Sequence, residues 1–172
     1  MNASSKELSR SKIEVLVKRY DSPDCHHYDF TEQDTITNFI LPFLEALGWN
    51  IFNVYEVKQR GYPQNFRRAL PPEERPLNFP DCIILLNGSP HIVIEFKGLN
   101  YGTVDRYETV VKKLLEKAEY LGFKCAVLTR FAETVVYDGA NGNQLIRFSN
   151  PKEYLSKFEE LWQYLSKEKA WE

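Results

Sequence analysis

The stretch 80–97, PDCIILLNGSPHIVIEFK, decides the fold of this chain. Two apolar runs, 81–86 and 91–96, flank the tetrapeptide Asn87-Gly88-Ser89-Pro90. An Asn-Gly pair between two apolar runs is typical of a β-hairpin. The second run carries apolar side chains on both faces, which indicates a central strand covered on both sides.

Three charged residues lie at the open end of this hairpin. Asp81 begins the first strand, and Glu95 and Lys97 end the second. Residues two apart in a strand share a face, so Glu95 and Lys97 project together. A charge beside buried strands is costly without a partner or a function. Two carboxylates can hold a hard divalent cation, and a lysine beside them can orient or deprotonate a water, so the pattern indicates a hydrolytic site.

The hairpin loop decides whether the two carboxylates share a face. A two-residue loop pairs Leu86 with Ser89 and places Asp81 and Glu95 on opposite faces. A three-residue loop pairs Leu86 with Pro90 and sets Asp81 opposite Glu95. The chemistry therefore requires an odd loop or a β-bulge.

The remaining sequence alternates helical and strand patterns. Thr31 is a good N-cap for a helix that runs to Leu47 and is kinked at Pro42. Other helical patterns cover 6–20, 104–121 and 150–168, and other strand patterns cover 125–129, 134–137 and 144–148. This order predicts the α/β (α+β) class, with a mixed central sheet flanked by helices. We expect one domain, 1–172, with a core at about 31–148 and peripheral helices at 6–20 and 150–168.

Composition excludes several classes of protein. Hydrophobic residues make up 43% of the 172 residues and aromatic residues 14%, which excludes an intrinsically disordered chain. Three cysteines imply no disulfide framework, and no stretch fits a membrane span or a secretory signal. We therefore expect a cytoplasmic protein that does not enter the membrane.

The segment 58–78 differs in charge from the rest of the chain. The net charge of −2 excludes a chain-wide positive charge but allows a local basic patch. This segment carries four prolines, two acidic residues and five basic ones: Lys58, Arg60, Arg67, Arg68 and Arg75. It is either a solvated loop or an arm that contacts DNA phosphates, and the sequence favours neither.

The motif residues resemble a known family. Pro80-Asp81 followed by Glu95-Phe96-Lys97 resembles the PD-(D/E)xK nuclease signature. The segment 31–49 is similar to the opening helix of the N-terminal nuclease domain of type I restriction enzyme R subunits and related single-chain restriction–modification enzymes. The segment 128–139 is similar to the closing strands of that domain. The resemblance spans about two thirds of the chain.

The resemblance implies a restriction-endonuclease-like fold and a role for each motif residue. Asp81 and Glu95 would be ligands of Mg²⁺, with Mn²⁺ as a substitute, and Lys97 would activate the attacking water. The helix glutamate, Glu32, would support the metal site.

The further supporting residues depart from the family's pattern or fit two interpretations. The family often has a Gln-xxx-Tyr pair on the following helix, and this chain has Glu116 and Tyr120 at that spacing. The change from glutamine to glutamate leaves the role of Glu116 open, and Tyr120 either stacks on a base or packs at the edge of the core. Glu56 precedes Lys58 at the spacing of Glu95 and Lys97, which fits an extra acid of the site or a surface salt pair.

The expected function is a metal-dependent endonuclease that hydrolyses DNA phosphodiester bonds as the cleavage module of a restriction system. Its partners would be double-stranded DNA and further domains or subunits that supply sequence recognition, methylation or translocation. One alternative is a catalytically silent DNA-binding module with a nuclease-like fold. Another is an interaction domain with no salt-dependent DNA binding.

Crowded carboxylates have an electrostatic consequence. Glu32, Asp81 and Glu95, joined by Glu56 or Glu116 if either faces the same cleft, should raise each other's pKa and oppose folding when no metal is bound. The sequence therefore predicts that Glu95→Gln melts higher than the wild type in chelator.

Overall fold

The computed structural model describes residues 4–25, 29–61, 80–100, 102 and 107–170. In chain order the elements are α1 (Ser5–Tyr20), α2 (Glu32–Thr35), the π-helical turn η2 (Ile36–Ile40), α3 (Leu41–Ala46), β1 (Val57–Gln59), β2 (Cys82–Leu86), β3 (Ser89–Phe96), α5 (Glu108–Leu121), β4 (Cys125–Thr129), β5 (Thr134–Asp138), β6 (Gln144–Phe148), α6 (Glu153–Ser156), α7 (Phe158–Leu165) and α8 (Lys167–Ala170). None of the helices in these ranges is long and apolar enough to cross a membrane.

Six strands form one mixed sheet in the order β1-β2-β3-β4-β5-β6. Strands β3 and β4 are parallel, and α5 provides the crossover between them. The other neighbouring pairs are antiparallel. The predicted class, a mixed sheet flanked by helices, is confirmed.

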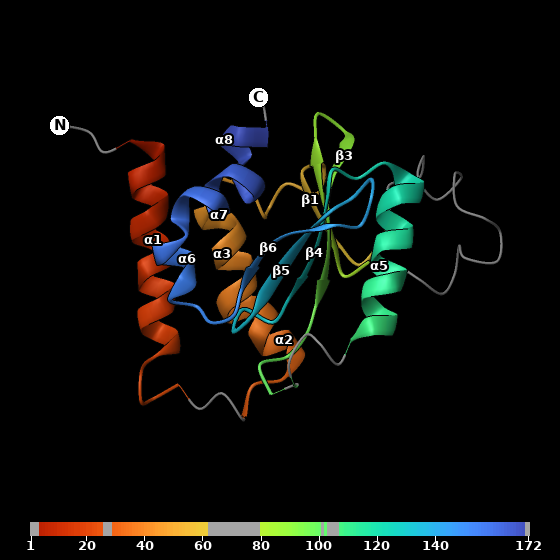
Figure 1. The fold of residues 1–172 in the computed structure, drawn as a ribbon. Coiled ribbons are helices and arrows are strands. Elements are labelled where there is room, and N and C mark those ends of the chain that lie inside the picture. Colours follow the sequence, from red (N-terminus) through yellow and green to blue (C-terminus); the bar gives the residue numbers. More distant parts are fainter. Residues whose placement is uncertain (1–3, 26–28, 62–79, 101, 103–106, 171–172) are drawn as a thin grey trace.

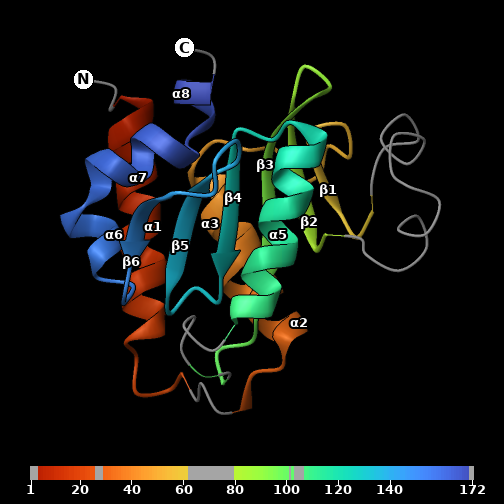
Figure 2. The ribbon, with the colours of Figure 1, turned by 45° about the vertical axis from the view of Figure 1, so that its right-hand side comes forward.

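Helices cover both faces of the sheet (Figure 1). Helix α5 lies on one face, over β3 and β4 (Figure 2). Alternate strand residues point to this side and are buried beneath α5: Ile83, Leu85, Val93, Ala126, Leu128 and Val135. Helices α3, α6 and α7 lie on the opposite side of the sheet, and α1 packs outside them against α3 and α6; all four contribute to the larger core cluster.

The terminal helical segments belong to this larger core. Ile13 of α1 and Leu161 of α7 are fully buried in it, although we expected helices 6–20 and 150–168 to be peripheral. The expected helix 150–168 is also broken into α6, α7 and α8. Two contacts with distant residues end α7: the Trp49 indole donates to the Leu165 carbonyl at 2.8 Å, and the Lys167 N–H donates to the Leu47 carbonyl at 3.0 Å.

The helix predicted at 31–47 contains a π-helical turn just before Pro42. The Leu41 N–H donates to the Ile36 carbonyl, five residues back. Pro42 has no N–H to offer the Asn38 carbonyl. Arg19 supplies the missing donor, with one nitrogen 3.3 Å from the Asn38 carbonyl and another 2.8 Å from its side-chain oxygen. The inserted residue changes the phase between the start of the helix and the core residues after it, and such turns are frequent at functional sites.

Candidate active site

The β2–β3 hairpin combines a two-residue turn with a bulge. Asn87 and Gly88 have φ values of 52° and 78°, as a type I′ turn requires, and Leu86 pairs with Ser89. The register then shifts between Ile84 and Leu85, so that Ile84 pairs with Ile92. The odd offset that the sequence required is therefore supplied by a bulge at residue 91.

The shifted register brings Asp81 beside the end of β3. Cys82 pairs with Ile94, and the next position sets Asp81 opposite Glu95 on the face that α5 covers. The Phe96 N–H donates to Asp81 Oδ2 at 2.7 Å. The Arg60 N–H donates to the Asp81 carbonyl at 2.9 Å, which joins the end of β1 to the same point.

The electrostatic surroundings of Asp81 are unusual. Burial and the neighbouring Glu95 charge raise the pKa of Asp81 to about 6. The Phe96 N–H and the Lys97 ammonium act in the opposite direction and do not cancel this rise. Asp81 therefore releases its proton close to neutral pH when no cation is bound.

Lys97 is bound to the second carboxylate. Its Nζ lies 2.8 Å from Glu95 Oε1 and 2.7 Å from the Phe96 carbonyl oxygen, and both charged side chains are largely buried. Burial lowers the pKa of Lys97. The hydrogen bond to Glu95 and the nearby negative charges raise it by more than burial lowers it, so the pKa lies above its ordinary value. Lys97 is thus a cation at neutral pH.

Glu32 lies at the first turn of the helix that leads into α3. Thr31 and Asp34 form the capping box that begins this helix, with the Asp34 N–H 3.1 Å from Thr31 Oγ1 and the Thr31 N–H 3.0 Å from Asp34 Oδ2. Glu32 is half-buried and begins α2. Helix α2 lies at the same end of the sheet as the end of β3 (Figure 2).

One hydrogen bond ties this helix to the chain after Lys97. The Leu99 N–H donates to Thr35 Oγ1 at 3.1 Å, and the Thr35 side chain is fully buried. The Glu32 charge contributes, as the weakest cause, to raising the pKa of both Asp81 and Lys97. The structure therefore brings Glu32 near the site, more distantly than Glu95.

Two of the five predicted DNA-contacting residues lie in the described part of the chain. Lys58 pairs with Ile83, whose side chain faces α5, so Lys58 projects to the same face as Asp81. Arg60 is exposed and follows β1 directly. Arg67, Arg68 and Arg75 fall outside the described residues.

Glu56 does not face the site. Its Oε1 accepts from the Asn50 N–H at 2.6 Å, and its Oε2 lies 2.8 Å from the Lys167 ammonium. Glu56 thus joins the turn after α3 to α8. Of the two interpretations that the sequence left open, the salt pair fits the structure, with Lys167 in place of Lys58 as the partner.

Glu116 and Tyr120 are also separate from the motif residues. Glu116 is exposed, and its carboxylate lies 3.9 Å from Lys112 on the same helix. It lines a groove of about 710 Å³ between α5 and the β5–β6 connection, and neither Asp81 nor Glu95 lines that groove. Tyr120 is 55% exposed, so it does not pack at the edge of the core.

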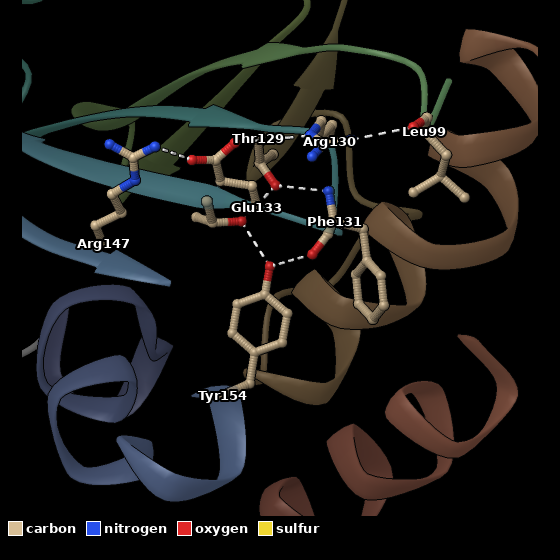
Figure 3. Close-up of polar contacts among 8 residues, drawn as sticks. Leu99, Thr129, Arg130, Phe131, Glu133, Arg147 and Tyr154 are labelled. Atoms are coloured by element: carbon tan, nitrogen blue, oxygen red, sulfur yellow. Dashed lines mark hydrogen bonds and ion pairs between the residues drawn. The ribbon is translucent and has the colours of Figure 1, made fainter. Parts of the chain in front are cut away.

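Sequence reasoning missed a buried polar cluster at the β4–β5 connection (Figure 3). The Glu133 side chain is only 3% exposed and forms ion pairs with Arg130 and Arg147. An Arg130 nitrogen also donates to the Leu99 carbonyl at 3.1 Å. The signal was present in the sequence, because Arg130 and Glu133 are charged residues in a short loop between two apolar strand runs.

The carboxylate pair suits a hard cation. Asp81 Oδ2 accepts the hydrogen bond from the Phe96 N–H. No described residue donates to Asp81 Oδ1, so this oxygen remains able to bind a cation. Mg²⁺ commonly binds one or two carboxylates and keeps several waters, so Asp81 and Glu95 fit it in number and type. Within the described ranges, no three His, Cys, Asp or Glu side chains lie close enough to hold a metal together.

Comparison of the chain with protein-family models, with curated proteins and with solved structures gave no match. The function proposed below is therefore argued from the geometry of this chain and from its motif residues.

Proposed function

We propose that this protein is a Mg²⁺-dependent endonuclease domain that hydrolyses phosphodiester bonds of double-stranded DNA. One observation carries the proposal: the bulged hairpin sets the half-buried carboxylate of Asp81 beside Glu95, and the Lys97 ammonium lies 2.8 Å from Glu95 on the same face. Apolar strands gain no stability from two adjacent acids, and the raised pKa of Asp81 is typical of functional carboxylates.

The finer fold assignment is part of the same proposal. We assign the chain to the restriction-endonuclease-like folds. The assignment is supported by the position of the three motif residues at one end of a central mixed sheet, between the helix that begins at Glu32 and the α5 face.

The residues of the chain divide the chemistry among them. A bound divalent cation would neutralise charge growing on the phosphate and lower the pKa of a bound water. Asp81 and Glu95 would hold that cation. Lys97 has three donors, of which Glu95 and the Phe96 carbonyl use two, and no described residue accepts the third. Because Lys97 stays protonated, its role is to donate to the attacking water or to a phosphate oxygen, rather than to remove a proton.

Lys58 and Arg60 would position the DNA backbone. Lys58 lies in the edge strand β1, on the face that carries Asp81, and Arg60 directly follows that strand and donates its N–H to the Asp81 carbonyl. Arg67, Arg68 and Arg75 would extend the contact along the phosphates. Such contacts bind DNA without reading its sequence, so recognition, methylation or translocation would come from further domains or subunits.

A catalytically silent DNA-binding module is the second candidate. Two observations favour it: the described residues offer two adjacent carboxylates rather than three metal ligands, and Lys97 binds one of the two.

Plasmid cleavage separates these functions. Supercoiled plasmid is incubated with the wild type in Mg²⁺, in Mn²⁺ and in chelator, and nicked and linear products are measured. We expect metal-dependent cleavage that falls at least about 100-fold in Asp81→Ala, Glu95→Ala and Lys97→Ala. Lys97→Ala should keep metal binding, and circular dichroism should show that each variant is folded.

DNA binding at several salt concentrations completes the experiment. Arg67→Gln and Arg68→Gln should each weaken binding evenly across sequences and reduce the salt slope by about one. Salt-dependent binding without any cleavage would support the silent module. Absence of both would leave only an interaction domain.

A further inference from the structure

The backbone just beyond Lys97 is held from two sides. The Leu99 N–H donates to Thr35 Oγ1 on the helix of Glu32, and the Leu99 carbonyl accepts from Arg130, each at 3.1 Å. The Lys97 N–H donates to the Thr129 carbonyl at 2.9 Å. The two residues that follow Lys97 are therefore fixed between the start of the helix at 32–46 and the end of β4.

Arg130 is in turn held by a buried acid. Glu133 is buried between Arg130 and Arg147, and its carboxylate lies 3.8 Å from Arg130 Nε (Figure 3). The Arg130 N–H also donates to the Glu133 carbonyl at 3.0 Å, which closes the short loop. Burying the Glu133 carboxylate between two partly buried arginines is costly, and replacing buried ion pairs by apolar groups is often stabilising. The cluster is therefore better explained by what Arg130 holds than by stability.

The loop between Arg130 and Glu133 is strained and tightly braced. Phe131 has a φ of 62°, which is rare for a bulky residue. Its N–H donates to Thr129 Oγ1 at 3.1 Å, and its carbonyl accepts from the Tyr154 hydroxyl at 2.6 Å. Thr134 links the same hydroxyl to Thr129, at 2.7 and 2.6 Å. Strain of this kind persists only where its surroundings enforce it, and it concentrates at functional sites.

We propose that Arg130 is a positioning residue of the active site: through the Leu99 carbonyl it fixes the backbone that aims Lys97 at Glu95, with Glu133 as its anchor. This inference rests on the proposed nuclease function. Arg130 touches neither substrate nor metal, and it acts by limiting where the Lys97 ammonium can lie relative to the two carboxylates.

The chain offers a matched control. Arg147 pairs with the same buried carboxylate from β6, whereas the Leu99 carbonyl accepts from Arg130. Arg130→Met and Arg147→Met each remove one cation from Glu133, and both should lose stability. Only Arg130→Met removes the donor to Leu99. Work at 10 °C, below the melting of both variants, keeps them folded for comparison.

Three measurements test the inference. Single-turnover cleavage at saturating DNA should fall at least tenfold in Arg130→Met and stay within twofold of the wild type in Arg147→Met, with DNA affinity equal in both.

In NMR spectra without metal, the Leu99 amide should exchange at least tenfold faster and the Lys97 Cε signal should move in Arg130→Met alone. Arg130 lines a surface cavity of about 440 Å³, so millimolar guanidinium should restore part of the cleavage by Arg130→Ala.

The outcomes distinguish the inference from the proposed function. Equal cleavage by Arg130→Met and Arg147→Met would overturn the positioning role, as would unchanged Leu99 and Lys97 signals in Arg130→Met. A wild type that never cleaves would overturn the nuclease function, and the NMR comparison would then decide alone whether Arg130 fixes the Lys97 backbone.

Discussion

Asp81 and Phe96 are joined by a 2.7 Å hydrogen bond from the Phe96 N–H to Asp81 Oδ2. Phe96 is the residue between Glu95 and Lys97, and its own side chain points into the opposite core. The bond therefore fixes the Asp81 carboxylate to the strand that carries the two other motif residues. The second oxygen, Oδ1, accepts no hydrogen bond from the residues that the structure describes.

The first prediction concerns Glu116. Because its carboxylate lies in the groove beside Lys112, Glu116→Ala should cleave plasmid within about twofold of the wild-type rate, as expected for a group that contacts no reacting atom. Glu32→Ala should lower the cleavage rate more than Glu116→Ala does and less than Asp81→Ala does. Rates in Mg²⁺ at matched salt provide the measurement. A tenfold loss in Glu116→Ala would mean that the Gln-xxx-Tyr role does transfer to this chain.

Glu56 and Glu116 show what the sequence could not supply. Their spacing to Lys58 and Tyr120 matched the expected pattern, because a pattern records only neighbours along the chain. Their surroundings depend on residues far away: Glu56 is bound by Lys167, 111 positions later, and the groove of Glu116 is closed by the β5–β6 connection. Contacts of this range follow from packing and not from spacing.

The hairpin shows where sequence reasoning was sufficient. The face requirement of Asp81 and Glu95 demanded an odd offset, from either a three-residue loop or a bulge. The structure has a two-residue turn and a bulge at His91. The position of the bulge was not predictable, because His91 is buried against Trp49, with ring centroids 5.9 Å apart, and Trp49 comes from another element.

The second prediction concerns the π-helical turn. Arg19→Ala should lower the free energy of unfolding by about 1 kcal/mol, because the Asn38 carbonyl loses the donor that replaces the missing Pro42 N–H. The adjacent Lys18→Ala is the control, since its exposed pair with Glu14 contributes little. Urea unfolding of both variants at pH 7 measures the difference. Equal stability of the two would show that the Arg19 contacts carry no net energy.

The third prediction concerns metal and stability. A cation that binds only the folded chain stabilises it by about 2.7 kcal/mol at 100 times its Kd. The melting temperature should therefore rise with Mg²⁺ or Mn²⁺ in the wild type and stay constant in Asp81→Ala. K⁺ at matched ionic strength controls for general salt effects, since a monovalent cation gains little from a carboxylate pair. A rise of the same size in Asp81→Ala would place the metal elsewhere on the protein.

The ion pair between Lys97 and Glu95 changes an expectation drawn from sequence. Repulsion among the acids alone predicts that Glu95→Gln melts higher than the wild type. In the structure Glu95 already forms an ion pair with Lys97, and the raised pKa of Lys97 keeps this lysine charged beside it. Glu95→Gln would therefore lose an attraction as well as a repulsion, so the variant that should gain stability is at Asp81.

The last prediction is the pH dependence of that gain. The pKa of Asp81 is about 6 in the folded chain and near its ordinary value of 3.8 when unfolded, so the folded state holds its proton more tightly. Stability from this group is then fully present below about pH 4 and is lost as pH rises through about 6.

Asp81→Asn keeps an oxygen for the Phe96 N–H and removes the titration. Its free energy of unfolding at pH 7 should therefore exceed that of the wild type by on the order of 1 kcal/mol, allowing for partial exposure of the carboxyl. Carboxyls with lowered pKa, such as Glu153, are common to both proteins and cancel in the difference. Urea unfolding in chelator from pH 4 to 7.5 gives the two curves, which should converge at acid pH; parallel curves would mean that Asp81 is not buried beside Glu95.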